Sequence, residues 1–473
     1  MKTTMRFAAA ILVAVLVATP MFAARGSANF TNFVALGDSY GAGFESGSLN
    51  ERHQPWSWPA VVARQVGYTF CPAGSTTPTP TCFAQPLVSF PGIGPELQLT
   101  SIVPTPSIVP ASGLGTPLMT GLQRPYNNLS IPGATVGALL TLTGAEPQTP
   151  GEPTAVTMAR FILRGQGTAV AQAIRQNPSF IALWIGGNDY LNVMFSGNPA
   201  TLTSAADFRT RYEAVLDSLI AGAPSAGMVV GNLPVGVPPY LRLVAPYLIN
   251  PATGQPVELG GQRIYFIVRN ADGTETPIAP DTIIPLHTRD RLAQGYGLPA
   301  ALRLVPPFSS LPHVGEPLTP NDVITSAELA QVIARVGEYN QAINAAAAAR
   351  DIPVADVAGL FNRVLSPTGE HLGPITVTGA PVTGGFFSFD FFHLTDLGYL
   401  LMGNEFIKAV NNAYDTEIPL ASIFQLATNN GAFFGEGGPN AGAFTVSTEA
   451  VQQIQSFWTV SPGTPRRGRA VSH

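Results

Sequence analysis

Four short runs of apolar residues constrain the fold of this chain more than any other feature of its sequence. Long stretches of other sequence separate them, and each run ends in polar or glycine-rich residues. Runs that are apolar throughout, rather than at every second position, are typical of parallel strands that are buried on both faces. The four runs span residues 33–36, 180–185, 228–230 and 352–355.

Helical patterns lie between these runs. The clearest covers residues 326–350, where apolar side chains recur at helical spacing, and Thr325 with Glu328 predicts a capping box at its start. Two shorter segments, 169–176 and 205–221, precede the second and third strands. Alternating strands and helices predict an α/β fold with a parallel sheet.

Three segments stand outside this alternation. Residues 71–125 are rich in proline, threonine and serine, and we expect a long loop there. Residues 236–320 form a second insertion, in which an apolar run at 263–268 followed by a turn at 270–273 predicts a hairpin. Residues 413–473 are predicted to be a C-terminal extension with an unstructured end.

The N-terminus has the order of features found in a secretory signal peptide. Lys2 and Arg6 precede an apolar run at 7–18, and small residues follow at 26–28. The run is short for a bilayer span, although an uncleaved anchor is the alternative interpretation. We therefore predict a signal peptide over residues 1–28 and export to the periplasm or the medium.

The two cysteines, Cys71 and Cys82, agree with export, because thiols close in sequence usually pair in an oxidising compartment. We predict a disulfide between them. No cluster of metal ligands or phosphate-binding glycine loop is visible, so the sequence predicts no metal and no cofactor. The net charge is 24 − 29 = −5, which does not suggest a nucleic-acid partner.

Two polar turns that follow predicted strands carry candidate chemistry. Ser39 lies among glycines after the first strand, where it could present its hydroxyl at the carboxyl edge of the sheet. Asn188 follows the strand at 180–185 and would place an amide at the same edge. Each motif alone is weak, because Gly-Asp-Ser and Asn-Asp sequences also build ordinary turns.

A third candidate is the pair Asp390 and His393. An aspartate three residues before a histidine can hold imidazole Nδ1 and leave Nε2 free as a base. Of the six histidines only His393 has a nearby upstream aspartate, a strand-end context and an apolar helix after it. A lone histidine is more often structural, but this setting favours a catalytic role.

The three turns together are more specific than any one of them, and with them the sequence resembles the SGNH, or GDSL, hydrolase superfamily. The resembling blocks are residues 37–39, 128–134, 186–189 and 390–393. The resemblance implies a three-layer α/β/α sandwich around a mainly parallel, flavodoxin-like sheet of about five strands. The corresponding domain would cover residues 29–412.

The resemblance also implies roles for individual residues. Ser39 would be the nucleophile, His393 the general base and Asp390 the group that orients it. Gly133, Asn188 and the N–H of Ser39 itself would form the oxyanion hole. The chain departs from the family pattern at Tyr40, where leucine is usual, and at Leu394, where proline is frequent.

These observations predict a secreted serine esterase or lipase that cleaves small-molecule or lipid-like carboxylic esters through an acyl-enzyme on Ser39. An acyltransferase or carbohydrate deacetylase could use the same site, and a catalytically idle binding protein could keep the same fold. The apolar residues of the 236–320 insertion could form a lid or acyl-chain wall that contacts a lipid surface transiently, or they could close a small core of their own. These residues are Tyr240, Leu241, Tyr247, Leu248, Tyr265 and Phe266.

Overall fold

The computed structural model describes residues 24–76, 82–101, 107–235, 239–250, 253–373 and 375–430. Most of the predicted signal peptide and the end of the predicted C-terminal extension therefore lie outside the described residues. Within the part described, no helix is both long enough and apolar enough to cross a membrane.

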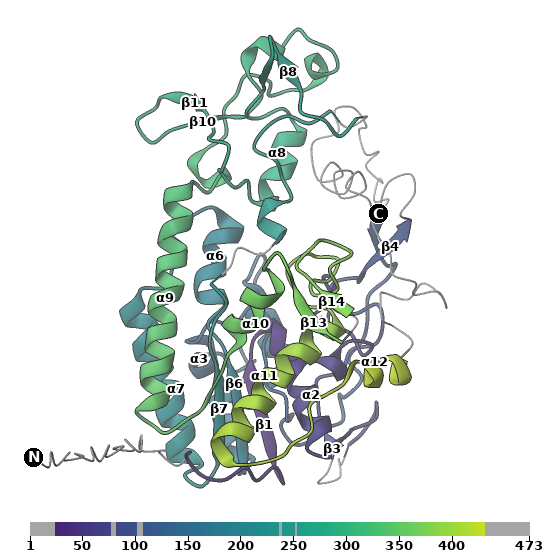
Figure 1. Cartoon of the computed structure of the whole chain (residues 1–473), viewed down its shortest axis with the longest axis vertical. Coiled ribbons are helices and arrows are strands. Elements are labelled where there is room, and N and C mark those ends of the chain that lie inside the picture. The colour runs from purple at the N-terminus through teal and green to yellow at the C-terminus, as the bar shows by residue number, and fades with distance from the viewer. Residues whose placement is uncertain are drawn as a thin grey trace, which may run out of the picture.

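A parallel sheet forms the centre of the molecule, as predicted (Figure 1). Its strand order is β1-β6-β7-β12, and every neighbouring pair is parallel. All residues of the first three strands are buried, which explains why their sequences are apolar throughout rather than alternating. The strands are β1 (Phe33–Gly37), β6 (Phe180–Trp184), β7 (Gly227–Gly231) and β12 (Val354–Ala355).

A fifth segment runs along the free edge of β1 without forming a regular strand. Asn127 O accepts a hydrogen bond from Ala35 N (2.8 Å), and the N–H of Leu129 donates to Ala35 O (2.8 Å). Farther along, Ile131 N donates to Gly37 O (2.9 Å). This segment accounts for the expected fifth strand, and it leads directly to Gly133 at the carboxyl edge of the sheet.

Helices cover both faces of the sheet and make the three layers that the resemblance implied. On one side α2 (Trp58–Gln65) and α10 (Val357–Val364) pack against α11 (Asp396–Tyr414), which also contacts β7 and β12. On the other side α7 (Ala205–Gly222) packs between α5 and α9, and α5 contacts β1. The predicted capping box of α9 is present at Thr325 and Glu328. The remaining helices are α1 (Ser39–Ala42), α3 (Ala138–Thr141), α4 (Thr154–Leu163), α5 (Ala169–Arg175), α6 (Asn188–Ser196), α8 (Arg289–Ala293), α9 (Ser326–Ala348) and α12 (Ile423–Asn430).

The segment expected to be a long loop contains short strands. Two small sheets form there, one parallel and one antiparallel, and the predicted disulfide joins Cys71 to Cys82 beside the first of them. The two strands of the first sheet have two residues each, which is too short for a pattern of period two, whereas residues 97–100 of the second sheet do alternate apolar and polar side chains. They are β2 (Thr69–Phe70), β3 (Cys82–Phe83), β4 (Leu97–Ser101) and β5 (Ser107–Pro110).

The second insertion projects beyond the end of α9 (Figure 1). Its predicted hairpin is present as β10 (Ile267–Arg269) and β11 (Glu275–Pro277). Leu248 and Phe266 are buried in an apolar cluster that consists of residues from this part of the chain, separate from the main core. The interpretation that the insertion closes its own core therefore holds for these two side chains. Its other strand pair is β8 (Glu258–Leu259) with β9 (Gln262–Arg263).

Both ends of the described chain contact the domain. Ser27 pairs with Ala226, and Arg25 N donates to Asp351 O (2.8 Å), so contacts with the domain begin before the predicted boundary at residue 29. At the other end Leu426 of α12 is buried against the main core. The hairpin β13 (Glu370–Leu372) and β14 (Ile375–Val377) precedes the loop that carries Asp390.

Candidate active site

Ser39 lies where the sequence predicted, at the carboxyl end of β1 and the start of α1. Asp38 caps this short helix by accepting a hydrogen bond from Tyr40 N at its Oδ1 (3.1 Å). The Ser39 side chain is largely buried, with 8% of the residue exposed.

The glycine two residues after Ser39 allows α1 to pack against the 128–131 segment. A Cβ atom at Gly41 would collide with the hydroxyl of Ser130. Asn128 holds the same helix by donating from Nδ2 to Gly41 O (2.7 Å). The block at residues 128–134 thus supports the turn that carries Ser39.

Asp390 and His393 are in contact, as predicted. His393 Nδ1 lies 2.7 Å from Asp390 Oδ2, and the backbone N–H groups of His393 and Phe392 donate to Asp390 Oδ1 (2.8 and 3.0 Å). Burial alone would raise the pKa of Asp390, but His393 and these hydrogen bonds outweigh it and lower the pKa to about 2. Asp390 is therefore ionised at neutral pH.

Two further donors to Asp390 were not apparent in the sequence. Ser388 Oγ donates to its Oδ1 (3.1 Å), and Gly47 N donates to its Oδ2 (2.8 Å). Phe391, between the aspartate and the histidine, has a positive φ of 60°. The loop adopts this uncommon conformation with the support of a distant turn, residues 45–48, which no local pattern connects to it.

Tyr40, the departure from the family pattern, contacts the histidine loop. Its hydroxyl donates to Phe392 O (2.7 Å), and its ring lies 5.7 Å from the ring of His393, measured between centroids. Phe44 approaches His393 more closely, at 4.7 Å. A leucine at position 40 could pack in this place but could not donate the hydrogen bond. The tyrosine therefore ties the segment that carries Ser39 to the loop that carries His393.

Asn188 and Gly133 lie at the same edge of the sheet. Asn188 is the first residue of α6, and its Nδ2 donates to Ala134 O (3.0 Å), next to Gly133. Gly133 has a φ of +82°, in the region that favours glycine. The hydrogen bond from Asn188 to Ala134 joins the second and third sequence blocks.

A pocket opens at this edge and contains both Ser39 and Asn188 in its wall. Its other lining residues are mostly apolar, and none of the described ones comes from the 236–320 insertion. The lining consists of Asp38, Ser39, Tyr40, Trp184, Gly187, Asn188, Tyr190, Leu191, Pro234, Phe361, Leu365 and Phe392.

Two buried aspartates beside the pocket have raised pKa values. Burial, with a smaller contribution from the charge of Asp189, raises the pKa of Asp38 to about 7, although the Tyr40 N–H opposes the shift. Burial likewise raises the pKa of Asp189 to about 6, against hydrogen bonds from Val136 N and the Thr203 hydroxyl. The sequence showed both residues but not their burial.

Comparison with known proteins identifies one matching family model. The model described as GDSL-like lipase/acylhydrolase matches residues 33–406. No curated protein matches the chain significantly.

Several solved structures are similar at low identity, and they cover most of this chain. Phospholipase A1 from Streptomyces albidoflavus is 15% identical, with 81% of this chain and 98% of that chain covered and a TM-score of 0.29. An extracellular lipase from Streptomyces rimosus is 14% identical, with 81% and 98% covered and a TM-score of 0.31. A family 3 carbohydrate esterase from Clostridium thermocellum is 12% identical, with 81% and 96% covered and a TM-score of 0.29.

Proposed function

Because the chain belongs to the family of GDSL-like lipases and acylhydrolases, we propose that it hydrolyses carboxylic esters through an acyl-enzyme on Ser39. The observation that carries this proposal is the 2.7 Å contact between His393 Nδ1 and Asp390, on a loop that Tyr40 ties to the Ser39 segment. A serine hydroxyl is a weak nucleophile and needs an adjacent base. The ionised Asp390 holds the imidazole so that Nε2 can serve as that base.

In the proposed reaction, His393 Nε2 takes the hydroxyl proton as Ser39 Oγ attacks the ester carbonyl. The imidazolium then returns the proton to the leaving alcohol, and the acyl group remains on Ser39. A water molecule, deprotonated by the same nitrogen, attacks this acyl-enzyme; the imidazolium returns the proton to Ser39 Oγ, and the acid is released.

The oxyanion that forms in both steps would be held by the N–H groups of Ser39 and Gly133 and by the amide of Asn188. Two findings support this role for Asn188. It lines the same pocket as Ser39, and its amide has two N–H bonds, of which one is used to reach Ala134 O. The second can donate to the oxyanion.

The apolar wall of the pocket supports esters with a hydrophobic acyl group, which is the esterase or lipase form of the proposal. Trp184, Leu191, Phe361 and Leu365 are among the residues of this wall. Acyl transfer and sugar deacetylation would use the same nucleophile. Product analysis must therefore identify the molecule that accepts the acyl group. We also retain the proposal that the insertion contacts lipid surfaces, through residues outside the pocket wall.

The deciding experiment measures hydrolysis of acyl esters of increasing chain length, with fluorophosphonate labelling in parallel. We expect wild type to be labelled and Ser39→Ala to be neither labelled nor active. Asn188→Ala should lose roughly 10²–10³ in kcat, because it removes one oxyanion donor, and should lose only about 1 kcal/mol of stability with the hydrogen bond to Ala134 O. An unlabelled, inactive wild type would instead support an idle binding protein, and product transfer to an added alcohol would support an acyltransferase.

Export is a separate part of the proposal. The predicted signal peptide supports it, as does the disulfide between Cys71 and Cys82. The N-terminal sequence of protein recovered outside the cytoplasm tests it. Arg25 and Ser27 contact the domain, and cleavage after Ala28 would remove both contacts. The same measurement decides whether cleavage follows Ala28 or an earlier residue.

A further inference from the structure

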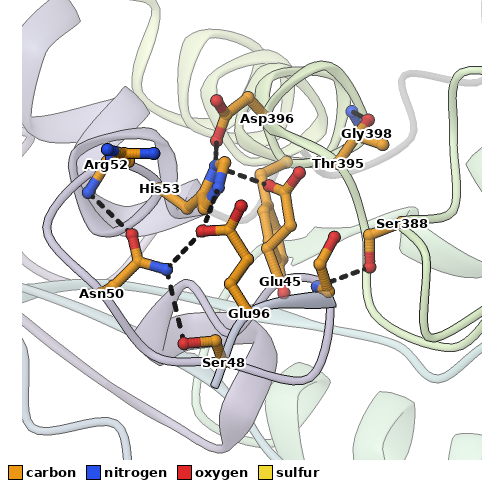
Figure 2. Close-up of polar contacts among 12 residues, drawn as sticks. Glu45, Ser48, Asn50, Arg52, His53, Glu96, Ser388, Thr395, Asp396 and Gly398 are labelled. Atoms are coloured by element: carbon orange, nitrogen blue, oxygen red, sulfur yellow. Dashed lines mark hydrogen bonds and ion pairs between the residues drawn. The ribbon is translucent and has the colours of Figure 1, made fainter. Parts of the chain in front are cut away.

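A second group of ionisable side chains is buried outside the pocket, and the ester hydrolase mechanism does not use it. Glu45 follows α1, His53 precedes α2, and Asp396 is the first residue of α11. The exposed fractions of these residues are 7%, 8% and 6%. Asp396 lies 343 residues from His53 in the sequence, and Figure 2 shows His53 paired with both Asp396 and Glu45.

The imidazole of His53 lies near more carboxylates than it can donate hydrogen bonds to. His53 Nδ1 lies 3.2 Å from Asp396 Oδ1 and 3.3 Å from Glu45 Oε2. One ring nitrogen carries at most one proton and can donate one good hydrogen bond. Glu45 Oε2 is in fact buried without any hydrogen bond. Its nearest positive group is His53, which it shares with Asp396 and Glu96, so three buried carboxylates face one imidazole.

Two of the three separations between the ligand atoms match those of a tetrahedral zinc site. Zinc binds histidine nitrogen and carboxylate oxygen at roughly 2.0–2.1 Å, and two ligands of a tetrahedral ion then lie about 3.3 Å apart. The measured separations from His53 Nδ1 are 3.2 and 3.3 Å. One ligand atom from each of Glu45, His53 and Asp396 lies within 4.8 Å of the others.

The other face of the imidazole has the support that metal-binding histidines usually have. His53 Nε2 lies 3.4 Å from Glu96 Oε2, and Asn50 Nδ2 donates to the same oxygen (2.9 Å) (Figure 2). With a metal bound, a carboxylate behind the ring would hold the proton on Nε2, and Nδ1 would release its proton to become a ligand.

From this geometry we propose that Glu45 Oε2, His53 Nδ1 and Asp396 Oδ1 bind a zinc ion, with a fourth position left for water. The ion would join two segments that meet at the active site. Gly47, two residues after Glu45, donates its N–H to Asp390, and Asp396 lies three residues after His393. Zinc would therefore stabilise the loop on which the Asp390–His393 pair depends, without taking part in the reaction.

A shared proton is the competing explanation. Burial raises the pKa of Glu45 well above its ordinary value, so its carboxyl group could keep a proton and donate it to Asp396. Burial opposes a charge on His53, but the charges of Glu45 and Asp396 outweigh it and raise the pKa of His53, so the proton could also lie on Nδ1. Zinc and the proton would occupy the same place between the carboxylates. Metal binding therefore distinguishes the two.

The test uses the purified whole protein and does not depend on ester hydrolysis. A chelator first removes bound metal from the wild type. We then measure the Zn²⁺ stoichiometry, the thermal stability and the visible spectrum of the Co²⁺-substituted protein. Ca²⁺ serves as a competing ion. The variants are Glu45→Gln, which removes a ligand charge, and Glu96→Gln, which leaves all three ligands. Glu51→Gln is the control, because Glu51 is exposed near the same segment.

We expect one zinc per chain, a lower melting temperature after stripping that Zn²⁺ restores, and a four-coordinate Co²⁺ spectrum. Glu96→Gln should weaken zinc binding by about 10–100-fold, Glu45→Gln by more, and Glu51→Gln not at all. The proposal is wrong if wild type binds no zinc and neither the chelator nor Zn²⁺ changes its melting temperature. A proton, rather than a metal ion, would then lie between the carboxylates. If Glu45→Gln fails to fold, zinc binding by the wild type and by Glu96→Gln still tests the proposal.

Discussion

Asp390 is the residue on which the geometry of the candidate site most depends. Two backbone N–H groups of its own loop, the hydroxyl of Ser388, Gly47 N and His393 all converge on its two oxygens. Such a set of donors stabilises the ionised carboxylate, which explains a pKa that is low despite burial. The same donors hold the carboxylate in the position from which it orients the imidazole.

Replacing Asp390 with asparagine should change both stability and activity. The pKa falls from 3.8 to about 2 on folding, a difference that corresponds to roughly 2 kcal/mol. Because the folded pKa is the lower one, this contribution is complete above about pH 4 and is lost as the pH falls toward 2. Urea unfolding of wild type and Asp390→Asn between pH 2 and pH 7 measures it.

Asparagine should also reduce kcat by about 10⁴, because it can hold the imidazole in the wrong tautomer. A stability difference between the two proteins that stayed constant across this pH range would contradict the assigned pKa. Unchanged kcat would contradict the orienting role of Asp390.

At the scale of elements, α1 shows how packing can reverse a local preference. Alanine is a better helix former than glycine, so propensity alone favours Gly41→Ala. In the structure a Cβ atom at this position would collide with the Ser130 side chain, on the segment that pairs with β1. The close approach of α1 to that segment therefore requires glycine at position 41.

We expect Gly41→Ala to lower the free energy of unfolding by about 1–3 kcal/mol, as overpacking does, and to reduce kcat by displacing Ser39. Gly337→Ala is the matched control, because nothing lies within 4 Å of a Cβ atom at Gly337 in α9. That change should stabilise the protein by roughly 0.5–1 kcal/mol. Chemical denaturation measures the free energy of unfolding of both variants. The prediction requires a decrease for Gly41→Ala and an increase for Gly337→Ala.

The active-site loops also connect elements that are distant in sequence. Tyr40 of α1 donates to Phe392 O, and Ser46 N donates to Ser388 Oγ (2.8 Å). These hydrogen bonds hold the β1–α1 turn against the loop before α11. The relative position of the proposed nucleophile and base thus depends on contacts between elements as well as on the elements themselves.

At the scale of the whole molecule, the second insertion has its own apolar cluster, and none of the described residues that line the pocket belongs to it. Its first residues do reach the active-site loop, since Tyr240 N donates to Phe391 O (3.2 Å). The insertion is therefore attached near the site but packs largely around its own core.

Phe266→Ala should loosen the insertion and leave the chemistry intact. Phe266 is 3% exposed within the separate cluster, and truncating a buried phenylalanine costs roughly 3–5 kcal/mol. We expect faster proteolysis within residues 239–320 and unchanged kcat/KM for acetyl esters. The control is Leu259→Ala, whose side chain is 62% exposed. Loss of activity toward acetyl esters would show that the insertion supports the site, and loss limited to long-chain esters would support the lid proposal.

The sequence alone determined the features that depend on neighbouring residues. Buried strands read as unbroken apolar runs, the capping box of α9 spans three residues, and the Asp390–His393 pair lies within one loop. The backbone geometry of a strand, a helix turn or a tight loop sets each of these spacings, so they can be recognised without the fold.

The tertiary structure alone decided which distant groups meet. His53 has no neighbouring acid of recognisable spacing, yet Glu45, Glu96 and Asp396 surround it. Tyr40 departs from the family pattern, and only the structure explains why, because its hydroxyl donates a hydrogen bond to Phe392 O. Such contacts arise only when the sheet and its two helix layers are assembled, because no local rule relates side chains that are hundreds of residues apart.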